Sequence, residues 1–401
     1  MSAQGLPGTL VRPSPPANGA GEVLGIIRTQ GPCSRAALVD LLGVARSTVA
    51  QRLDLLLQRD LIVAEQGGGG TRGRPTTLFR FNHARGVVLA ADLGVTHAGV
   101  AVTDLAGTVL ADTSHDLEIA AGPRHVLDWL VQRFTELLDR IGMDPSRVFG
   151  VGVGLPGPVE ASTGTPVRPP IMPGWDGFPV AQHLADHYRV PVLVDNDVNL
   201  LALGEQRMHW PDSEHLLCVK VATGIGMGII TDGRLARGAQ GAAGDLGHVH
   251  LADKQDYLCA CGNHGCLEAV AGGAALARRL TERGLPVPDA RHIIGLAKQG
   301  NTEVADLLRQ AGRLIGEVLA TVVNVLNPSL IIITGDLAQA QEQLLTGIRE
   351  MIYSRSLPLA TRDLRIVVSS TPGSTGIVGA AAIVLDRVLA PAAIDRLVST
   401  G

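Results

Sequence analysis

Three of the five cysteines in this 401-residue chain fall within eight consecutive positions, and this cluster constrains the fold more than any other feature. It reads C-A-C-G-N-H-G-C-L-E from 259 to 268, and G-D-L-G-H precedes it at 244–248. Three thiolates and one imidazole suit zinc, and four protein ligands leave no open position for a catalytic water. We therefore predict a structural zinc site made by Cys259, Cys261, Cys266 and a histidine.

The cysteine cluster leaves two questions open. Either His248 or His264 could supply the fourth ligand, and the residues alone do not decide between them. The competing interpretation of the cluster is three reduced core cysteines, or part of a disulfide pattern. It is disfavoured because apolar neighbours are absent and because disulfides are rare in a reducing compartment.

Length and composition indicate a cytoplasmic protein with more than one domain. A chain of 401 residues is long enough for several substantial cores. No apolar run approaches the roughly 20 residues that a membrane span needs. The first residues, M-S-A-Q-G-L-P-G, lack the basic and apolar regions of a secretion signal. We therefore expect no membrane partner.

Charge is distributed unevenly along the chain. The formal net charge of −4 argues against a nucleic-acid partner. Residues 1–83, however, contain nine arginines and five acidic residues, a balance of +4, so the remainder carries −8. Lysine occurs only at 220, 254 and 298, so the abundance of arginine is partly a habit of the whole chain. The asymmetry favours a basic N-terminal head.

The N-terminal segment has the pattern of a helix-turn-helix. Residues 1–19 are rich in Pro, Gly and Ser, and we predict a disordered tail. Two helices ending near Leu42 are followed by Gly43 and by a third helix from about Ala45. Short helices joined through a glycine are typical of a helix-turn-helix, although a small helical bundle with a polar face is the alternative. The polar face that we expect to contact DNA comprises Arg46, Ser47, Thr48, Gln51 and Arg52.

A glycine- and arginine-rich segment follows the predicted helices. It reads G-G-G-G-T-R-G-R-P at 67–75 and lies between predicted strands at 61–63 and 77–81. Arg72 and Arg74 suit a narrow minor groove, where negative potential is concentrated. An ordinary glycine linker would not account for the arginines. We therefore predict a winged helix-turn-helix domain over residues 20–83.

From residue 86 the pattern changes to strands that alternate with helices, which is typical of an α/β fold. Similar glycine turns end strands in both halves, and this indicates two lobes around a cleft. We place a small lobe at 84–200 and a large lobe with the zinc loop at 201–390. A last helix at about 377–389 could return to the small lobe.

The motifs of this body resemble one known family. They read, in order, D-L-G-V-T, G-L-P-G-P, P-G-W-D, D-N-D-V-N, A-T-G-I-G-M-G and G-A-A-G-D-L-G-H, followed by the cysteine cluster. Together they resemble the ROK family of repressors, open reading frames and kinases, over about residues 20–390. The resemblance implies a two-lobed α/β actin-like fold, ribonuclease H-like, as in sugar kinases. The winged helix in front resembles the regulator branch, which includes xylose and N-acetylglucosamine repressors.

The resemblance also implies a sugar site in the cleft. In the family, the histidine that matches His248 binds zinc through one ring nitrogen and faces the sugar with the other, which favours His248 over His264. Asn196, Asp197 and Glu268 match sugar-contacting residues. Asp245 departs from the pattern, because sugar-binding members usually carry Glu there.

The nucleotide site that the resemblance implies has degenerated. Val95, His97, Met227 and Asp336 stand where the family's kinases have glycine or other residues suited to ATP. Side chains at such turns keep backbone N–H groups from phosphate. The predicted site comprises Asp92, Gly94, Thr96, Thr223, Gly224, Gly226 and Gly335.

These observations predict a sugar-responsive DNA-binding transcriptional regulator, a repressor of genes for carbohydrate uptake or metabolism. Its partners would be double-stranded operator DNA, a sugar or sugar phosphate, and further copies of the chain in a homodimer or higher homo-oligomer. We expect it in the cytoplasm, on the nucleoid when bound to DNA. The alternative is an active ATP-dependent kinase for a hexose or amino sugar, with Mg²⁺ and ATP as cofactors and Asp197 as general base.

Overall fold

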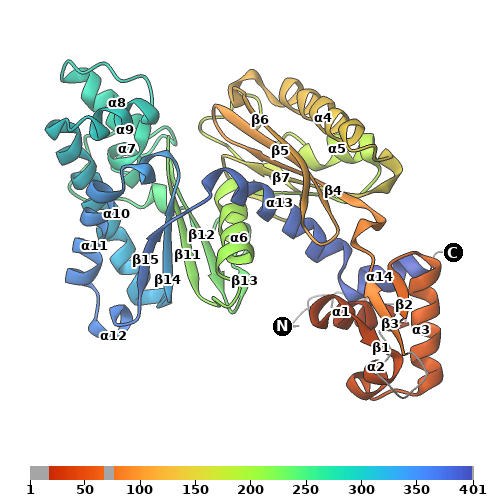
Figure 1. Ribbon diagram of the computed structural model, residues 1–401. Helices are drawn as coiled ribbons and strands as arrows, with labels where there is room; N and C mark the ends of the chain where they lie inside the picture. Colours follow the sequence, from red (N-terminus) through yellow and green to blue (C-terminus); the bar gives the residue numbers. More distant parts are fainter. Residues whose placement is uncertain (1–17, 67–75, 400–401) are drawn as a thin grey trace, which may run out of the picture. The chain divides into compact units, whose positions relative to one another are not determined.

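The computed structural model describes residues 18–66 and 76–399, which form two compact units (Figure 1). One unit combines the chain up to Arg85 with the chain from Leu385 onward. The other unit comprises residues 86–384. Among the described helices, none alone is long and apolar enough to cross a membrane. One bent pair of helices, 373–388 with 391–399, is long and apolar enough when its two members are taken together.

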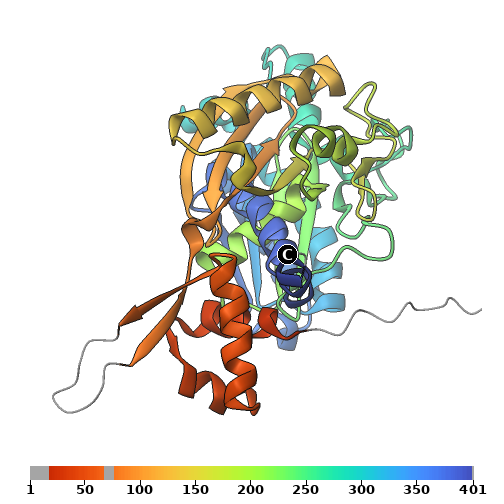
Figure 2. The same cartoon turned by 90° about the vertical axis from the view of Figure 1, so that its right-hand side faces the viewer.

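The first unit packs three N-terminal helices against a small antiparallel sheet of strand order β1-β3-β2 (Figure 2). Ser34 begins the second helix, because its side chain accepts a hydrogen bond from the backbone N–H of Ala37. Gly43 ends that helix in the left-handed conformation. The elements are α1 (Ala20–Gln30), β1 (Cys33–Ser34), α2 (Arg35–Leu42), α3 (Arg46–Gln58), β2 (Ile62–Gln66) and β3 (Thr77–Phe81).

The C-terminal helix α14 (Pro391–Ser399) belongs to this first unit, which the sequence analysis did not anticipate. The buried carboxylate of Asp395 accepts hydrogen bonds from the backbone N–H groups of Gly21 (2.8 Å) and Gly19 (3.4 Å). Asn18 donates to the backbone carbonyl of Asp395. Residues 18 and 19 are therefore held by α14 and do not belong to the tail predicted over 1–19; the rest of that prediction lies outside the described residues.

The second unit contains two five-stranded sheets. The first has strand order β10-β7-β4-β5-β6 and the second β13-β12-β11-β14-β15. In each sheet three neighbouring strands run parallel and two antiparallel strands complete one edge. Every residue of β4 (Val87–Leu93) and of β14 (Leu330–Thr334) is buried, as expected for strands covered on both faces.

The other strands of the two sheets are two to eight residues long. They are β5 (His97–Asp104), β6 (Val109–Asp116), β7 (Val148–Leu155), β10 (Val192–Asn196), β11 (Leu216–Val221), β12 (Ile225–Thr231), β13 (Arg234–Leu235) and β15 (Arg365–Val368). A separate hairpin comprises β8 (Val159–Glu160) and β9 (Thr165–Pro166).

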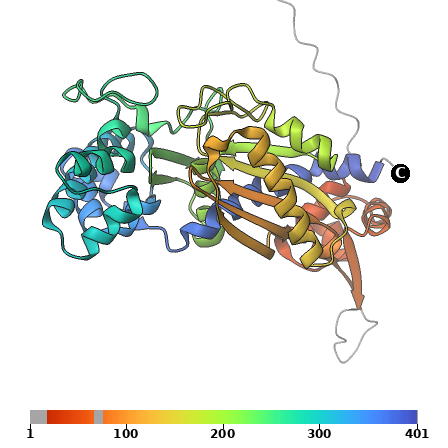
Figure 3. The same cartoon turned by 90° about the horizontal axis from the view of Figure 1, so that it is seen from above.

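Helices cover both sheets. Figure 3 shows α4 (Pro123–Arg140) lying across the first sheet, while α10 (Thr302–Leu326) and α11 (Gln341–Arg355) pack with the second. Helix α6 (Asp197–His209) follows β10 of the first sheet but packs on the second. Gly228 of β12 permits this close approach, because a Cβ there would collide with the Val198 carbonyl oxygen. The remaining helices are α5 (Val180–Tyr188), α7 (Leu267–Ala271), α8 (Gly273–Glu282), α9 (Ala290–Lys298), α12 (Pro358–Thr361) and α13 (Pro372–Val388).

The predicted last helix at 377–389 differs from the structure, where α13 begins five residues earlier at Pro372 and ends at Val388. Its N-terminal extension contains Gly373, Ser374 and Thr375, which are poor helix formers in isolation. Packing decides the helix start instead: Thr375 is fully buried, and a Cβ at Gly204 of α6 would collide with its carbonyl oxygen.

The role of Asp395 can be tested in the first unit. The Asp395→Ala substitution removes two hydrogen bonds to the start of α1 and should destabilise this unit by about 1–2 kcal/mol. Hydrogen exchange of the α1 amides should then accelerate. Asp395→Asn keeps one acceptor oxygen and serves as the control, with a smaller expected effect. Unchanged protection of α1 in Asp395→Ala would contradict this role.

Candidate functional site

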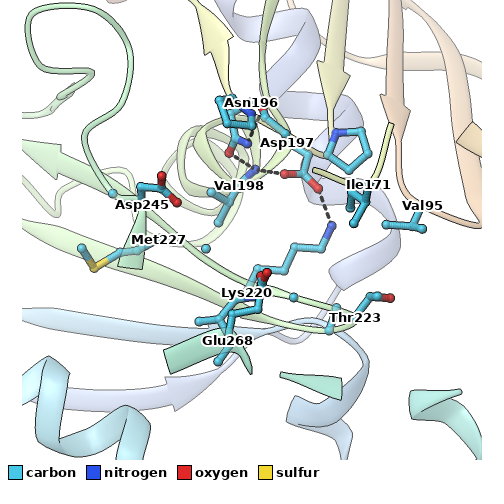
Figure 4. A pocket seen from close by; sticks show the side chains of 18 of the residues that line it. Val95, Ile171, Asn196, Asp197, Val198, Lys220, Thr223, Met227, Asp245 and Glu268 are labelled. Atoms are coloured by element: carbon cyan, nitrogen blue, oxygen red, sulfur yellow. Dashed lines mark hydrogen bonds and ion pairs between the residues drawn. The ribbon is translucent and has the colours of Figure 1, made fainter. Parts of the chain in front are cut away.

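The second unit contains a cavity bounded by residues of both sheets (Figure 4). Asp197 at the start of α6 forms one wall, and Lys220 on β11 and the turn at 223–226 form another. The segment 241–248 and Glu268 on α7 complete it. The cavity encloses about 170 Å³. A cavity of about 150 Å³ holds one benzene molecule, so this one can accommodate a six-membered ring.

Lys220 and Asp197 form an ion pair in the middle of the cavity (Figure 4). The Lys220 Nζ atom lies 2.6 Å from Asp197 Oδ2, and only 18% and 8% of the two side chains are exposed. The other carboxylate oxygen of Asp197 accepts from the backbone N–H of Val198 at 2.8 Å. Burial opposes the charge on Lys220, but the carboxylates of Asp197 and Asp92 outweigh it and raise its pKa. Both oxygens of Asp197 are therefore engaged.

Asp92 lies behind this ion pair at the end of β4. Its side chain is buried, and its Oδ1 atom has no hydrogen-bond partner among the described residues. Burial raises the pKa of Asp92 to about 6, although Lys220 acts in the opposite direction and Asp197 adds to the rise. Asp92 therefore binds a proton at a higher pH than an ordinary aspartate does.

A second ion pair anchors the segment that leads to residue 245. Arg237 Nε donates to Asp195 Oδ2 at 2.6 Å, and the Asp195 side chain is 6% exposed. The other oxygen of Asp195 accepts from Asn199 Nδ2 at 2.8 Å. Arg237 therefore positions the chain that carries Asp245 along the cavity.

The residues predicted to bind sugar surround the cavity, but Asn196 and Glu268, like Asp197, have hydrogen-bond partners inside the protein. Asn196 caps α6, because its Oδ1 accepts from Val198 N–H while its Nδ2 donates to the Gly157 carbonyl. Glu268 Oε2 accepts from the backbone N–H of Ile225 at 3.0 Å. Asp245 is exposed, and its Oδ1 lies 3.8 Å from His248 Nε2.

The Cys3His cluster is assembled in the structure. The ligand atoms of its four residues lie within 4.8 Å of one another. Cys261 Sγ lies 3.7 Å from Cys266 Sγ, and Cys259 Sγ lies 3.6 Å from His248 Nδ1. Zinc–sulfur bonds of about 2.3 Å in a tetrahedron give sulfur–sulfur edges of about 3.8 Å. The cluster could therefore hold a structural metal ion: His248 Nδ1 faces the sulfurs and its Nε2 faces Asp245.

His264, the alternative fourth ligand, is outside the cluster. It is exposed, and its Nδ1 contacts the backbone carbonyl of Gln255 at 3.0 Å.

The residues predicted for nucleotide binding lie in two groups. Thr96, Thr223, Gly224 and Gly226 line the cavity, as do the four departures from the kinase pattern. Two glycine turns are already filled by side chains: a Cβ at Gly94 would collide with the His97 ring, and one at Gly224 with Glu268. Gly335, Gly94 and Asp92 do not line the cavity.

Five of the seven residues predicted to contact DNA lie on α3, and one of these five has partners inside the protein. Arg46, Ser47 and Gln51 are exposed and Thr48 is half-buried. Arg52 faces inward instead: its Nε donates to the Asn18 carbonyl at 3.0 Å, its Nη1 lies 3.5 Å from Glu22, and its side chain is 15% exposed. The guanidinium of Arg52 is therefore engaged by the chain at the start of α1, and its contact with DNA stays a prediction. Arg72 and Arg74 lie outside the described residues.

Sequence reasoning missed Lys220 and Arg237. The available signal for Lys220 was a lysine in an otherwise apolar strand, L-L-C-V-K-V, in a chain with three lysines. No local signal marked Arg237, because its partner Asp195 lies 42 residues away.

Comparison with known proteins identifies the second unit. The profile of the ROK family matches residues 88–387, well over half of the chain. The chain belongs to the ROK family. A xylose repressor from Bacillus spizizenii is 28% identical over 364 residues, which cover 90% of this chain and 94% of that protein.

Two solved structures of ROK proteins differ in how much of the chain they match. A ROK family transcriptional regulator, a homologue of the Escherichia coli Mlc protein, superposes with a TM-score of 0.80 at 27% identity and covers 96% of this chain and 99% of that chain. A Streptomyces griseus glucokinase in complex with glucose and AMPPNP gives a TM-score of 0.63 at 27% identity and covers 74% and 99%. The ROK protein described here therefore has the two-lobed actin-like sugar-kinase fold, with about a quarter of its length unmatched in that kinase.

Removal of one sulfur should empty the metal cluster. Cys261→Ser replaces a thiolate by a hydroxyl that zinc binds poorly, so the variant should contain far less metal than the wild-type protein by elemental analysis. Cys33→Ser is the matched control, because Cys33 lies in the other unit, where its Sγ donates to the Gly31 carbonyl. Equal metal content in the wild-type and Cys261→Ser proteins would rule out this ligand set.

The raised pKa of Asp92 predicts a pH-dependent cost to the fold. The folded-state pKa of about 6 exceeds the ordinary 3.8, so the protonated form stabilises the fold and this stability is lost as pH rises through 6. Between pH 3 and pH 8 the loss amounts to about 3 kcal/mol. The Asp92→Asn variant should gain stability relative to wild type over that range in chemical denaturation. Asp116→Asn, at an exposed position, should not gain stability in this way. A difference in stability between Asp92→Asn and the wild-type protein that does not change with pH would contradict the raised pKa of Asp92.

Proposed function

We propose that this ROK protein is a sugar-responsive, DNA-binding transcriptional repressor of genes for carbohydrate uptake or metabolism. One observation carries the proposal: the regulator structure covers 96% of the chain, whereas the glucokinase structure covers 74%. The similarity to a xylose repressor over 90% of the chain supports the same function. Such a protein acts in the cytoplasm, on the nucleoid.

The first unit is the proposed DNA-binding head. Helices α2 and α3 form the helix-turn-helix, and the exposed first turns of α3 present Arg46, Ser47 and Gln51 to the major groove. The pair β2 and β3 forms the wing, whose connecting segment carries Arg72 and Arg74. Two such heads in a homodimer would read the two half-sites of an operator.

The cavity of the second unit is the proposed effector site. Asp245, Glu268 and Asp197 offer carboxylate oxygens to sugar hydroxyls, and His248 offers its Nε2 atom. We propose that the ion in the Cys3His cluster is zinc, which would hold the imidazole in a fixed orientation and take no part in a reaction.

Phosphoryl transfer is the less favoured function of this cavity. A general base must be free to accept a proton from the reacting hydroxyl. Asp197 is held instead by the Lys220 ammonium at 2.6 Å and by the Val198 N–H at 2.8 Å. Two turns that would approach phosphate are filled by His97 and Glu268. The ion pair and the filled turns support binding without turnover.

Operator binding tests the proposed head. Genomic footprinting with the purified protein would identify operator fragments, and gel retention would then measure affinity. Arg46→Ala should weaken binding to the cognate operator by about 1–3 kcal/mol. Binding to random DNA should be less affected, because contacts to the bases determine the specificity.

The control for Arg46→Ala is Gln58→Ala, an exposed change at the other end of α3 that should bind like wild type. Arg46→Ala and Gln51→Ala proteins that both retain wild-type affinity and specificity would show that α3 does not read DNA in this way.

A further inference from the structure

The charges around the cavity are strongly unbalanced. Four carboxylates line it, from Asp197, Asp245, Glu268 and Asp336. Among the described residues that line it, Lys220 is the single lysine or arginine. A ligand in this cavity therefore meets mainly hydrogen-bond acceptors that carry negative charge.

The Lys220 ammonium is not available to neutralise a bound anion. It lies 2.6 Å from Asp197 Oδ2, with Asp92 close behind it. Figure 4 shows its amine directed at Asp197 across the cavity. Its positive charge is already balanced by that carboxylate, which leaves the other three lining carboxylates uncompensated.

Three further groups at the cavity that could bind an anion are neutral or already engaged. Burial lowers the pKa of His97 below its ordinary value of 6.5, so its imidazole is neutral at pH 7. The backbone N–H of Ile225 in the glycine turn donates to Glu268, and that of Val198 donates to Asn196 and Asp197. Arg291 influences His97 but does not line the cavity.

We propose that the cavity selects a sugar without a phosphate or carboxylate group. Lys220 determines this selectivity because its positive charge is neutralised by Asp197 and is not available to an anionic ligand. Sugar hydroxyls and protonated amines can donate to the lining carboxylates, whereas phosphate oxygens only accept. The inference rests on the proposed sugar site and names its ligand class: free aldoses and amino sugars, with their phosphate esters excluded.

Calorimetric titration of the full-length, zinc-loaded protein without DNA tests this selectivity. The probes are D-glucose, D-xylose, D-glucosamine and N-acetyl-D-glucosamine, each beside a phosphate ester of the same sugar. At least one free sugar should bind, and its ester should bind at least tenfold more weakly. Raising the salt concentration should narrow that gap by screening the repulsion, while the affinity for an uncharged sugar should change little.

Charge variants identify the cause of the selectivity. Asp336→Asn removes one negative charge from the cavity lining and should lower the ratio of the affinity for the free sugar to the affinity for its ester severalfold. Asp232→Asn makes the same change at an exposed position outside the cavity and should leave the ratio unchanged. Arg291→Ala should also leave it unchanged, because the proposal gives this arginine no contact with the ligand.

Three results would overturn the proposal: an ester that binds as tightly as its free sugar, an unchanged ratio in Asp336→Asn, or no binding by any probe. Because the titration contains no DNA, these results are independent of operator binding. Failure to bind any operator, with the expected sugar selectivity intact, would count against the repressor function alone.

Discussion

The ion pair between Asp197 and Lys220 is the interaction on which the cavity depends. Asp197 follows β10 of the first sheet, and Lys220 lies on β11 of the second. Their ion pair, with 2.6 Å between Lys220 Nζ and Asp197 Oδ2, therefore connects the parts of the cavity that the two sheets provide. Removal of one partner from a buried ion pair typically costs about 3–5 kcal/mol, because the other charge is left uncompensated. The side chain of Asp197 therefore has a structural role that is incompatible with a role as a general base.

A common physical pattern relates the ion pair to the rest of the site. Side chains of the protein itself occupy places where an ATP-dependent enzyme would need free groups or an open glycine turn. Lys220 holds Asp197, Glu268 takes the Ile225 N–H of the glycine turn, and the His97 ring covers Gly94. A cavity filled in this way can still offer carboxylates to hydroxyls. A fold shared with a glucokinase is thus compatible with recognition of sugar without chemistry.

Local patterns in the sequence predicted more of this protein than its long-range contacts. Cys259, Cys261 and Cys266 announce a metal cluster by spacing alone, and the structure brings His248 to them and leaves His264 outside. The inward turn of Arg52 and the docking of α14 could not be predicted. Both depend on partners far away in the sequence, Asn18 for Arg52 and Asp395 for the start of α1. Lys220 was missed for the same reason, since its role depends on an ion pair with Asp197 across the cavity.

We propose that a sugar bound in this cavity changes the affinity of the N-terminal head for operator DNA. Gel retention of an operator fragment by the full-length protein, with increasing free sugar, tests it most directly. Allosteric coupling of about 1–3 kcal/mol corresponds to a change in operator affinity of roughly 5- to 150-fold at saturating sugar. We predict a change in that range. Identical retention at every sugar concentration, while calorimetry shows the sugar bound, would contradict the account.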